Sequence, residues 1–306
     1  LFAALIATGA EEYKSNKLLA WIFVLPALLG LVQFVLIPFL LAVMLSFTNL
    51  RLGSPLPLEF VGFNQYRRIF ADEAFMAALR NNALFALIVV PLQTALALLL
   101  ALLVNQPLRG MTVFRTLFFM PVVFPLSLVA VVWILVFAPG PQGLLNHVLD
   151  TLTVGGWRPR DFLHDPAWAL PAISLTSIWQ GVGFQMVILL AALQGIPREL
   201  YDAARVDGAN RWQQFVFITL PQLRNAMIFV VLVTTILAFR LFDQVQIMTQ
   251  GGPNHATTTV MYEAVNTAFG SQQVARAAAM TVVFFLVVLL ITLLQRAVAR
   301  HEGVYE

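Results

Sequence analysis

The chain has 306 residues, of which 60% are hydrophobic and 11% are charged, and its mean hydropathy is +0.84. A soluble domain usually carries about 25% charged residues, so this composition excludes a single soluble core and indicates a surface that faces lipid. The absence of cysteine excludes disulfides, thiolate catalysis and a cysteine-based metal centre. The formal charge of +3 comes with scattered arginines, a pattern that does not indicate a nucleic-acid partner.

At the N-terminus, residues 1–10 are apolar but have no basic segment and no long apolar core, so we expect no signal peptide there. Because the chain begins with Leu1 rather than Met, we expect a short N-terminal piece to be missing. We assign residues 1–17 to an N-terminal tail, residues 18–300 to a transmembrane domain and residues 301–306 to a C-terminal tail.

The transmembrane domain contains six segments that are long and apolar enough to cross a membrane, which takes about 20 residues. They are residues 18–47, 84–104, 116–138, 169–193, 226–248 and 277–294. An even number of spans places both termini on one side. The loops on that side hold ten Lys and Arg residues, against eight on the other side. We therefore predict an all-α membrane protein of six transmembrane helices with both termini on one side. The small excess of Lys and Arg favours that side as the cytoplasmic one, and this assignment depends mainly on the motif described below.

Several predicted spans contain proline, which is tolerated in a membrane helix where neighbours satisfy the freed carbonyls. The prolines that predict kinks are Pro26, Pro38, Pro91, Pro121 and Pro125. Between the first two spans, residues 59–80 place Phe63, Tyr66 and Phe70 on one helical face, with charged residues between them. This pattern predicts an amphipathic helix at the outer membrane surface. Residues 139–166, rich in Gly and Pro, predict an ordered outer loop.

The segment 195–221, between the fourth and fifth predicted spans, has the signals of two short helices joined by a tight turn. Pro197 suits a first helical turn, and Gly208 can end that helix with a positive φ. Asn210 followed by Gln213 is typical of the capping pair that begins a second helix. We expect these helices to lie on the cytoplasmic face, held rigidly between two spans. There, a short helix with a flat face of small residues can bind a groove on a partner.

The same segment also has the spacing of a known motif. Its elements are Asp202-Ala-Ala, three residues, Gly208, nine residues, and Ile218-Thr-Leu-Pro221. This pattern resembles the EAA motif of binding-protein-dependent ABC importer permeases, with Asp202 in place of the usual glutamate. Asn225 is a departure, because a proline often follows the Leu-Pro element in that family, and it leaves the local helix geometry open.

Two further stretches are similar to the carbohydrate branch of this family, the maltose- and glycerol-3-phosphate-type permeases: Phe242-Asp243 and Thr249-Gln-Gly-Gly-Pro253. The resemblance covers about residues 18 to 300. It implies a type I ABC importer permease fold with a cytoplasmic coupling helix, in the bacterial inner membrane. It implies a second homologous permease, two ATPase subunits that hold ATP and Mg, an extracytoplasmic solute-binding protein and the lipid bilayer as partners. The resemblance implies no cofactor on this chain itself.

For the coupling helix, the resemblance implies contacts with the ATPase subunits. Ala203, Ala204 and Gly208 would supply the fit and the turn, and Tyr201 and Asp202 would supply polar contacts. The full predicted coupling set is Glu199, Tyr201, Asp202, Ala203, Ala204, Asp207 and Gly208. The alternative interpretation is an ordinary inner loop with two amphipathic turns.

Polar residues in the predicted spans are candidates for a substrate pathway, and the set chosen is Gln180, Gln185, Arg240 and Asp243. Arg240 and Asp243 are three residues apart, so we expect them on one helix face. Charges at membrane depth suggest a pathway, and an interfacial ion pair is the alternative. Gln180 and Gln185 could meet the hydroxyls of a sugar or, equally, form hydrogen bonds between helices. For Gln33 and Gln93 the same two alternatives remain, contact with sugar hydroxyls or hydrogen bonds between helices.

No enzyme motif accompanies these residues. The only lysines, Lys14 and Lys17, do not follow a Gly-rich phosphate loop, and no histidine pair has metal-ligand spacing. We therefore predict a non-catalytic permease without a metal, which imports a disaccharide or oligosaccharide by alternating access. Import of glycerol-3-phosphate or a glycerophosphodiester is the first alternative. An ion-coupled secondary carrier, which would need intramembrane carboxylates, and a scaffold without transport are more distant ones.

Overall fold

The computed structural model describes residues 21–106 and 108–301, where the secondary structure consists of helices joined by loops, with one isolated β-bridge between Thr48 and Phe60. The predicted all-α fold is therefore confirmed. The predicted N-terminal tail, residues 1–17, lies outside the described residues, as does all but the first residue of the predicted C-terminal tail.

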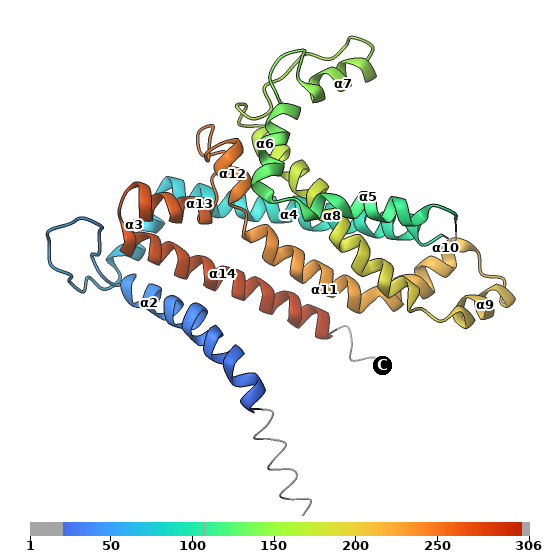
Figure 1. The fold of residues 1–306 in the computed structure, drawn as a ribbon, viewed down its shortest axis with the longest axis horizontal. Helices are drawn as coiled ribbons and strands as arrows, with labels where there is room; N and C mark the ends of the chain where they lie inside the picture. The colour runs from blue at the N-terminus through green and yellow to red at the C-terminus, as the bar shows by residue number, and fades with distance from the viewer. Residues whose placement is uncertain (1–20, 107, 302–306) are drawn as a thin grey trace, which may run out of the picture.

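The helices follow one another in the order seen along the colour gradient of Figure 1. They are a helix from Trp21 that ends in η1 (Val32–Leu36) and α2 (Ile37–Leu45), then α3 (Asn64–Phe70), α4 (Glu73–Val104), α5 (Met111–Val123), α6 (Leu126–Val136), α7 (Leu144–Leu152), α8 (Ala169–Gln194), α9 (Arg198–Val206), α10 (Arg211–Gln214), η2 (Phe215–Thr219), α11 (Leu220–Phe239), α12 (Asp243–Met248), α13 (Val260–Val265), η3 (Asn266–Gly270) and α14 (Val274–His301), where η marks a π-helical turn.

Five helices of the described chain are long and apolar enough to cross a membrane, and a bent pair of helices would make a sixth span. The five are Trp21–Leu45, Glu73–Val104, Ala169–Gln194, Arg211–Met248 and Val274–Val298. Each overlaps one of the predicted spans. Helices α4, α11 and α14 run along the length of the molecule, with α9 at one end and α3 and α13 at the other (Figure 1).

The third predicted span, residues 116–138, corresponds to the bent pair α5 and α6, which meet at an angle of 101°. Phe124 between them has an extended backbone, with φ −77° and ψ 139°. The ring of Pro125 imposes this conformation, since it disfavours a helical residue immediately before a proline. The kink predicted from Pro125 is thus confirmed, whereas Pro91 stays inside the continuous helix α4. Beyond the bend, α6 leaves the bundle toward α7 (Figure 1).

The predicted amphipathic helix over residues 59–80 is only partly correct. It divides into α3 and the first turns of α4, with Asp72 between them as the N-cap that accepts a hydrogen bond from Ala74 N at 2.9 Å. The side chains of Ile69 and Phe75 are completely buried in the protein core rather than placed at a lipid surface. Asp72 also forms an ion pair with Arg276 of α14, which fastens the start of α4 to that helix.

Helix α4 lies at the centre of the packing, with α8, α11 and α13 against it. Its buried alanines, Ala97 and Ala101, belong to a core cluster with Met186 and Leu189 of α8 and Leu223 of α11. Alanine at these positions lets neighbouring helices approach closely, as is usual for helix packing in membranes. The walls of any cavity between these three helices are therefore well fixed.

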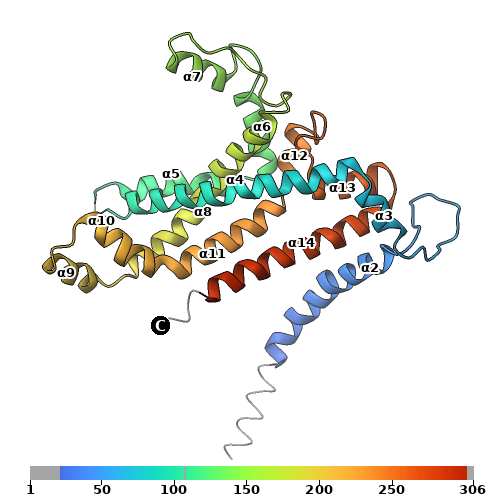
Figure 2. The same ribbon diagram turned by 180° about the vertical axis from the view of Figure 1, so that it is seen from behind.

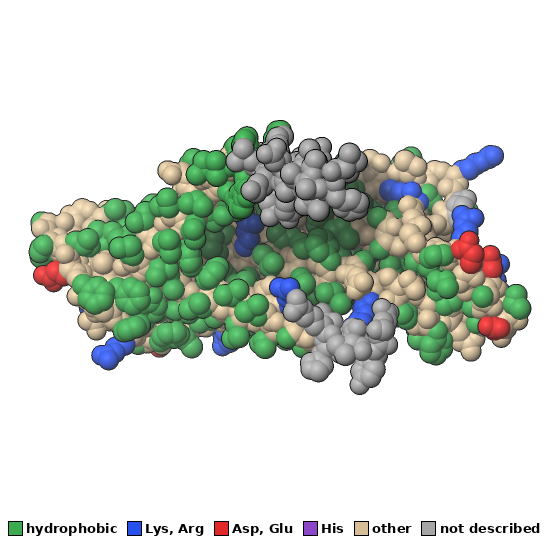
Figure 3. All heavy atoms as spheres, turned by 90° about the horizontal axis from the view of Figure 1, so that it is seen from below, with side chains coloured by type: hydrophobic (Ala, Val, Ile, Leu, Met, Phe, Trp, Pro, Cys, Tyr) green, Lys and Arg blue, Asp and Glu red, His purple; other side chains and the backbone are tan. Residues whose placement is uncertain are grey.

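The helix Trp21–Leu45 is the exception to this packing. No residue of its most apolar stretch is buried, and Phe34 is 79% exposed. The helix meets α14 where the Phe39 and Phe285 rings lie 4.6 Å apart, and its N-terminal end leans away from the bundle in both Figure 1 and Figure 2. Hydrophobic side chains also predominate on the long face in Figure 3. These surfaces fit contact with lipid or with another membrane subunit.

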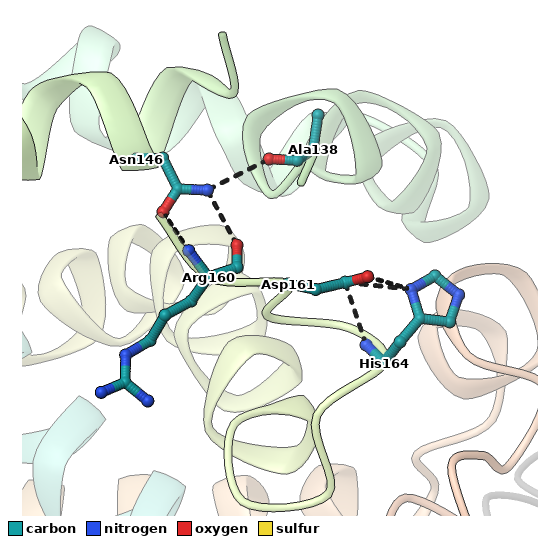
Figure 4. Close-up of polar contacts among 5 residues, drawn as sticks. All are labelled: Ala138, Asn146, Arg160, Asp161 and His164. Carbon is teal, nitrogen blue, oxygen red and sulfur yellow. Dashed lines mark hydrogen bonds and ion pairs between the residues drawn. The ribbon is translucent and has the colours of Figure 1, made fainter. Parts of the chain in front are cut away.

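The loop over residues 139–166 is ordered as predicted, and a single buried side chain organises it (Figure 4). The Asn146 amide nitrogen donates to the carbonyl oxygens of Ala138 at 3.3 Å and Arg160 at 2.8 Å. Its amide oxygen accepts from Trp157 Nε1 at 3.0 Å and from Arg160 N at 2.9 Å. The Arg160 guanidinium in turn lies over the rings of Trp157 and Trp168. Every hydrogen-bonding group of the Asn146 amide is therefore used.

We expect Asn146→Ala to open this loop, because four partly buried hydrogen-bonding groups lose their partner. Leaving them unsatisfied costs roughly 2 kcal/mol, which makes the open loop roughly thirty times more populated. The measurement is the rate of trypsin cleavage after Arg160 in the purified protein. His147→Ala, at an exposed neighbouring position, should leave that rate unchanged. Equal cleavage rates in the two variants would show that Asn146 does not hold the loop.

Candidate functional site

Two adjoining cavities form a groove between α4, α6, α8, α11 and α12, with volumes of about 250 and 320 Å³. We call it the α4–α8–α11 groove. The residues shared by the two cavities are Gln93, Leu126, Gln180, Gly181, Thr234 and Leu237. All four predicted pathway residues line it: Gln180 borders both cavities, Arg240 and Asp243 border the first, and Gln185 borders the second. The structure thus brings together residues from α8, from the C-cap of α11 and from α12.

The two predicted glutamines of α8 differ in what they touch. Gln185 is buried, and its amide nitrogen donates to Thr234 Oγ1 of α11. This contact ties α8 to α11, which is the alternative role considered for glutamines in the spans. Gln180 is half-buried, and its side chain makes no hydrogen bond to another residue of the described chain. Of the two, Gln180 is therefore the one whose amide is available to a ligand in the groove.

Arg240 and Asp243 do not share one helix face, and that expectation is wrong. Helix α11 ends at Phe239, Arg240 follows as its C-cap, and α12 begins only at Asp243. Between the two helices, Phe242 has a non-helical backbone with φ −140° and ψ −59°. Both charged side chains are exposed, and no ion pair joins them within the described part of the chain.

The break after α11 is stabilised by side chains far away in the chain. They donate hydrogen bonds to the backbone carbonyls that have no helical partner at the break. The Asn82 amide nitrogen donates to Phe239 O at 3.5 Å, and Thr259 Oγ1 donates to Leu241 O at 2.9 Å. Asn82 also accepts from Val260 N at 2.9 Å. A backbone carbonyl without a partner is costly in a membrane, so Asn82 and Thr259 make the open geometry around Arg240 possible.

Sequence reasoning missed Ser177, Thr234 and Gln244, which also line the groove. Ser177 Oγ donates to Gln244 Oε1 at 2.7 Å, a bond that joins α8 to α12. One signal could have found Ser177, since it precedes Gln180 by three residues on the face of α8 that also carries Phe184. No comparable signal exists for Gln244, whose position depends on the break before α12.

The predicted coupling loop folds largely as its local signals indicate. Helix α9 ends in a Schellman motif: Gly208 has φ +79°, its N–H donates to Arg205 O at 3.1 Å, and Ala209 N donates to Ala204 O at 2.8 Å. Asn210 and Gln213 form the expected capping box, with bonds of 2.9 and 2.8 Å. The second short helix is wrong as a separate element, because α10 continues through η2 into α11.

The predicted coupling residues lie on an exposed helix, since α9 has no buried residue. Glu199, Asp202, Ala203, Asp207 and Gly208 are exposed, and Tyr201 and Ala204 are half-buried. Asp202 forms an ion pair with Arg205 one turn away. Exposed apolar side chains nearby, which sequence reasoning did not single out, are Val206 at 88% and Trp212 at 70% exposure. Such a surface fits contact with another protein.

No group of three or more His, Asp or Glu side chains within residues 21–106 and 108–301 could hold a metal ion.

Comparison with known proteins gives consistent results. Residues 93–303 match the model of the family described as binding-protein-dependent transport system inner membrane component. The diacetylchitobiose uptake system permease protein NgcF of Streptomyces coelicolor is 37% identical, over 89% of this chain and 79% of its own length. The lactose transport system permease protein LacF of Rhizobium radiobacter is 34% identical, over 92% of this chain and 94% of its own length.

The fold also matches solved structures. A bacterial ABC transporter chain involved in the import of the acidic polysaccharide alginate superimposes with a TM-score of 0.80 at 22% identity, covering 96% of this chain and 99% of that one. A second chain, from the alginate transporter in complex with its alginate pentasaccharide-bound periplasmic protein, has a TM-score of 0.81 at 22% identity, covering 95% of this chain and 96% of that one.

Proposed function

Because the chain belongs to the family of binding-protein-dependent transport system inner membrane components, we propose that it is the permease subunit of an ABC importer that carries a disaccharide or oligosaccharide. The observation that carries the proposal is the α4–α8–α11 groove, where Gln180, Arg240 and Asp243 converge from separate elements. The names of the relatives quoted above support a sugar rather than glycerol-3-phosphate or a glycerophosphodiester.

The chemistry of the groove suits a sugar. The amide of Gln180 can both donate to and accept from hydroxyls, the Asp243 carboxylate accepts from them, and the Arg240 guanidinium donates to them. Phe85 and Phe242 add aromatic surface in the same cavity. An apolar wall with a few convergent polar groups is the usual composition of a small-molecule site.

Transport by an ABC importer needs partner proteins, and the exposed surfaces of this chain support contacts with them. We assign α9 to the cytoplasmic side, where two ATPase subunits would bind it and hydrolyse ATP. The helix Trp21–Leu45, which has no buried residue in its most apolar stretch, supports a second, similar permease. A solute-binding protein would deliver the sugar on the opposite side, with both chain termini in the cytoplasm. ATP binding would then reweight pre-existing inward- and outward-facing states, which is alternating access.

The experiment is sugar uptake by the complete complex in proteoliposomes, with its solute-binding protein and ATP. Radiolabelled diacetylchitobiose, lactose and maltose form the panel. We expect ATP-dependent accumulation of at least one of them. An assembled complex that hydrolyses ATP but accumulates none of the panel would contradict the proposed sugar substrate, and accumulation without ATP would point to a secondary carrier.

We expect Gln180→Ala to lower the rate of sugar uptake roughly fivefold, because a hydrogen bond between a neutral amide and a hydroxyl is worth about 1 kcal/mol. Gln142→Ala, at an exposed position in the loop near α7, is the matched control and should transport at the wild-type rate. If both variants transport equally well, Gln180 does not contact the sugar on its way through the groove.

A further inference from the structure

Tyr201 differs from the charged residues of the predicted coupling set, because its side chain faces the permease. Glu199, Asp202 and Asp207 are exposed, whereas Tyr201 is half-buried against the core cluster that contains Leu189 and Leu223. Its hydroxyl lies 2.9 Å from Thr219 Oγ1, and the two form a hydrogen bond. Tyr201 therefore connects α9 to the body of the protein rather than to a partner beyond it.

Thr219 is the last residue of the π-helical turn η2. Only 5% of it is exposed, and its hydroxyl also donates to Gln214 O at 3.4 Å. The N–H of the next residue, Leu220, donates to Phe215 O, in the hydrogen-bond pattern of a π-helix. A π-helical turn inside an α-helix is rare and is frequently found at functional sites.

Beyond η2, helix α11 leads directly to the groove. It has 20 residues, a length of about 30 Å at the usual rise of an α-helix. Thr234 and Leu237 line the groove from its far end, and Arg240 follows it there. A displacement applied at η2 can therefore reach the groove through one continuous helix.

Helix α9 has few other attachments. Its residues are not buried, and it is joined to α8 and α10 by short turns at Pro197 and Gly208. The bond between Tyr201 and Thr219 is a third connection, placed in the middle of the helix. This bond ties the middle of α9 to η2, and it adds to the packing of the Tyr201 ring against the core cluster.

We propose that the hydrogen bond between Tyr201 and Thr219 is the joint through which movement of α9 reaches α11, with Tyr201 as a positioning residue. The proposal rests on the proposed function, because it takes α9 as the element that the ATPase subunits move. The joint does not contact sugar or ATP. It determines how much of the movement of α9 is converted into opening or closing of the groove.

The test compares Tyr201→Phe, Thr219→Val and the double variant in the complete complex in proteoliposomes. The measured quantity is the amount of sugar imported per ATP hydrolysed, with the panel sugar that the wild-type complex accumulates. We expect each single change to lower this ratio about fivefold, the factor that corresponds to one hydrogen bond. The double variant should be no worse than Thr219→Val alone, because Tyr201→Phe removes only a bond that Thr219→Val has already removed.

Two controls separate the joint from general stability. Tyr66→Phe removes a similar hydroxyl pair, with Ser46 Oγ at 2.7 Å, in a region remote from α9, and should keep the wild-type ratio. Thr219→Ser retains a hydroxyl and should restore most of the coupling. A role in folding alone would lower the yield of assembled complex without changing the ratio of the complexes that form.

An unchanged ratio in assembled Tyr201→Phe complexes would overturn the proposal, as would a double variant whose loss is the product of the two single losses. Failure of the proposed function is distinguishable, because the wild-type complex itself would then accumulate no sugar with ATP. In that case the proposal about the bond between Tyr201 and Thr219 would fail as well.

Discussion

Gly208→Pro is expected to abolish the stimulation of ATP hydrolysis by the loaded solute-binding protein, while the subunits still assemble in the membrane. At this position φ is +79°, and the N–H donates to Arg205 O. Proline fixes φ near −65° and has no N–H. The Schellman motif that ends α9 would lose roughly 3 kcal/mol, which reduces the population of the native turn by more than roughly a hundredfold. The direction of the chain from α9 into α10 would change.

Gly208→Ala provides the graded comparison. A Cβ at Gly208 would meet nothing within 4 Å, so alanine is strained only by the backbone conformation. A left-handed conformation costs an L-residue about 1–2 kcal/mol, and partial stimulation is expected. The measurement is ATP turnover of the reconstituted complex with and without loaded solute-binding protein. An assembled Gly208→Pro complex with full stimulation would show that this loop does not transmit the signal.

Gly183→Ala is expected to cause the largest loss of stability among single methyl additions to α8. A Cβ there would lie 2.0 Å from Phe118 O and 2.9 Å from Phe119 Cα, both backbone atoms of α5. Backbone atoms cannot avoid the added Cβ by a change of rotamer, as a side chain can, so α5 would have to move away from α8. Overpacking of this kind typically costs about 1–3 kcal/mol. Because α5 leads into the bend before α6, the wall of the groove at Leu126 would move as well.

Two other glycines make this prediction specific. At Gly181 a Cβ would meet Gln93 Nε2 at 2.4 Å, the end of a flexible side chain that can move, so Gly181→Ala should destabilise less. At Gly30, within the first helix, a Cβ would meet nothing within 4 Å, and Gly30→Ala should not lower stability. The measurement is the midpoint of thermal unfolding of the purified protein in detergent. Equal midpoints for Gly183→Ala and Gly30→Ala would contradict the close approach of α5 and α8.

The features that could be predicted from the sequence are those with local causes. Chain length and hydropathy predict the apolar spans, Gly208 predicts the end of α9, and Asn210 with Gln213 predicts the capping box. Each of these signals acts within a few residues of the feature it produces. The spacing of the EAA-like motif predicts the family of the protein, and the comparisons then establish that family.

The features that could not be predicted depend on residues far apart in the chain. Arg240 and Asp243 are three residues apart, and within a continuous helix they would share a face. The break between them is stabilised by Asn82, 157 residues earlier than Phe239, and by Thr259, whose side chains donate to Phe239 O and Leu241 O. Pro125 indicated a kink, but the angle of 101° also depends on where α6 packs. The helix propensity of nearby residues does not report such contacts between distant parts of the chain.

The position of Asn82 has a consequence for the biosynthesis of the protein. Its amide oxygen accepts from Val260 N, 178 residues later in the chain. At a synthesis rate of 5–20 residues per second, roughly 9–36 seconds pass between the two residues leaving the ribosome. During that interval Asn82 must rely on water, lipid headgroups or other helices for its hydrogen bonds. The region around Arg240 is therefore completed late, after most of the chain has entered the membrane.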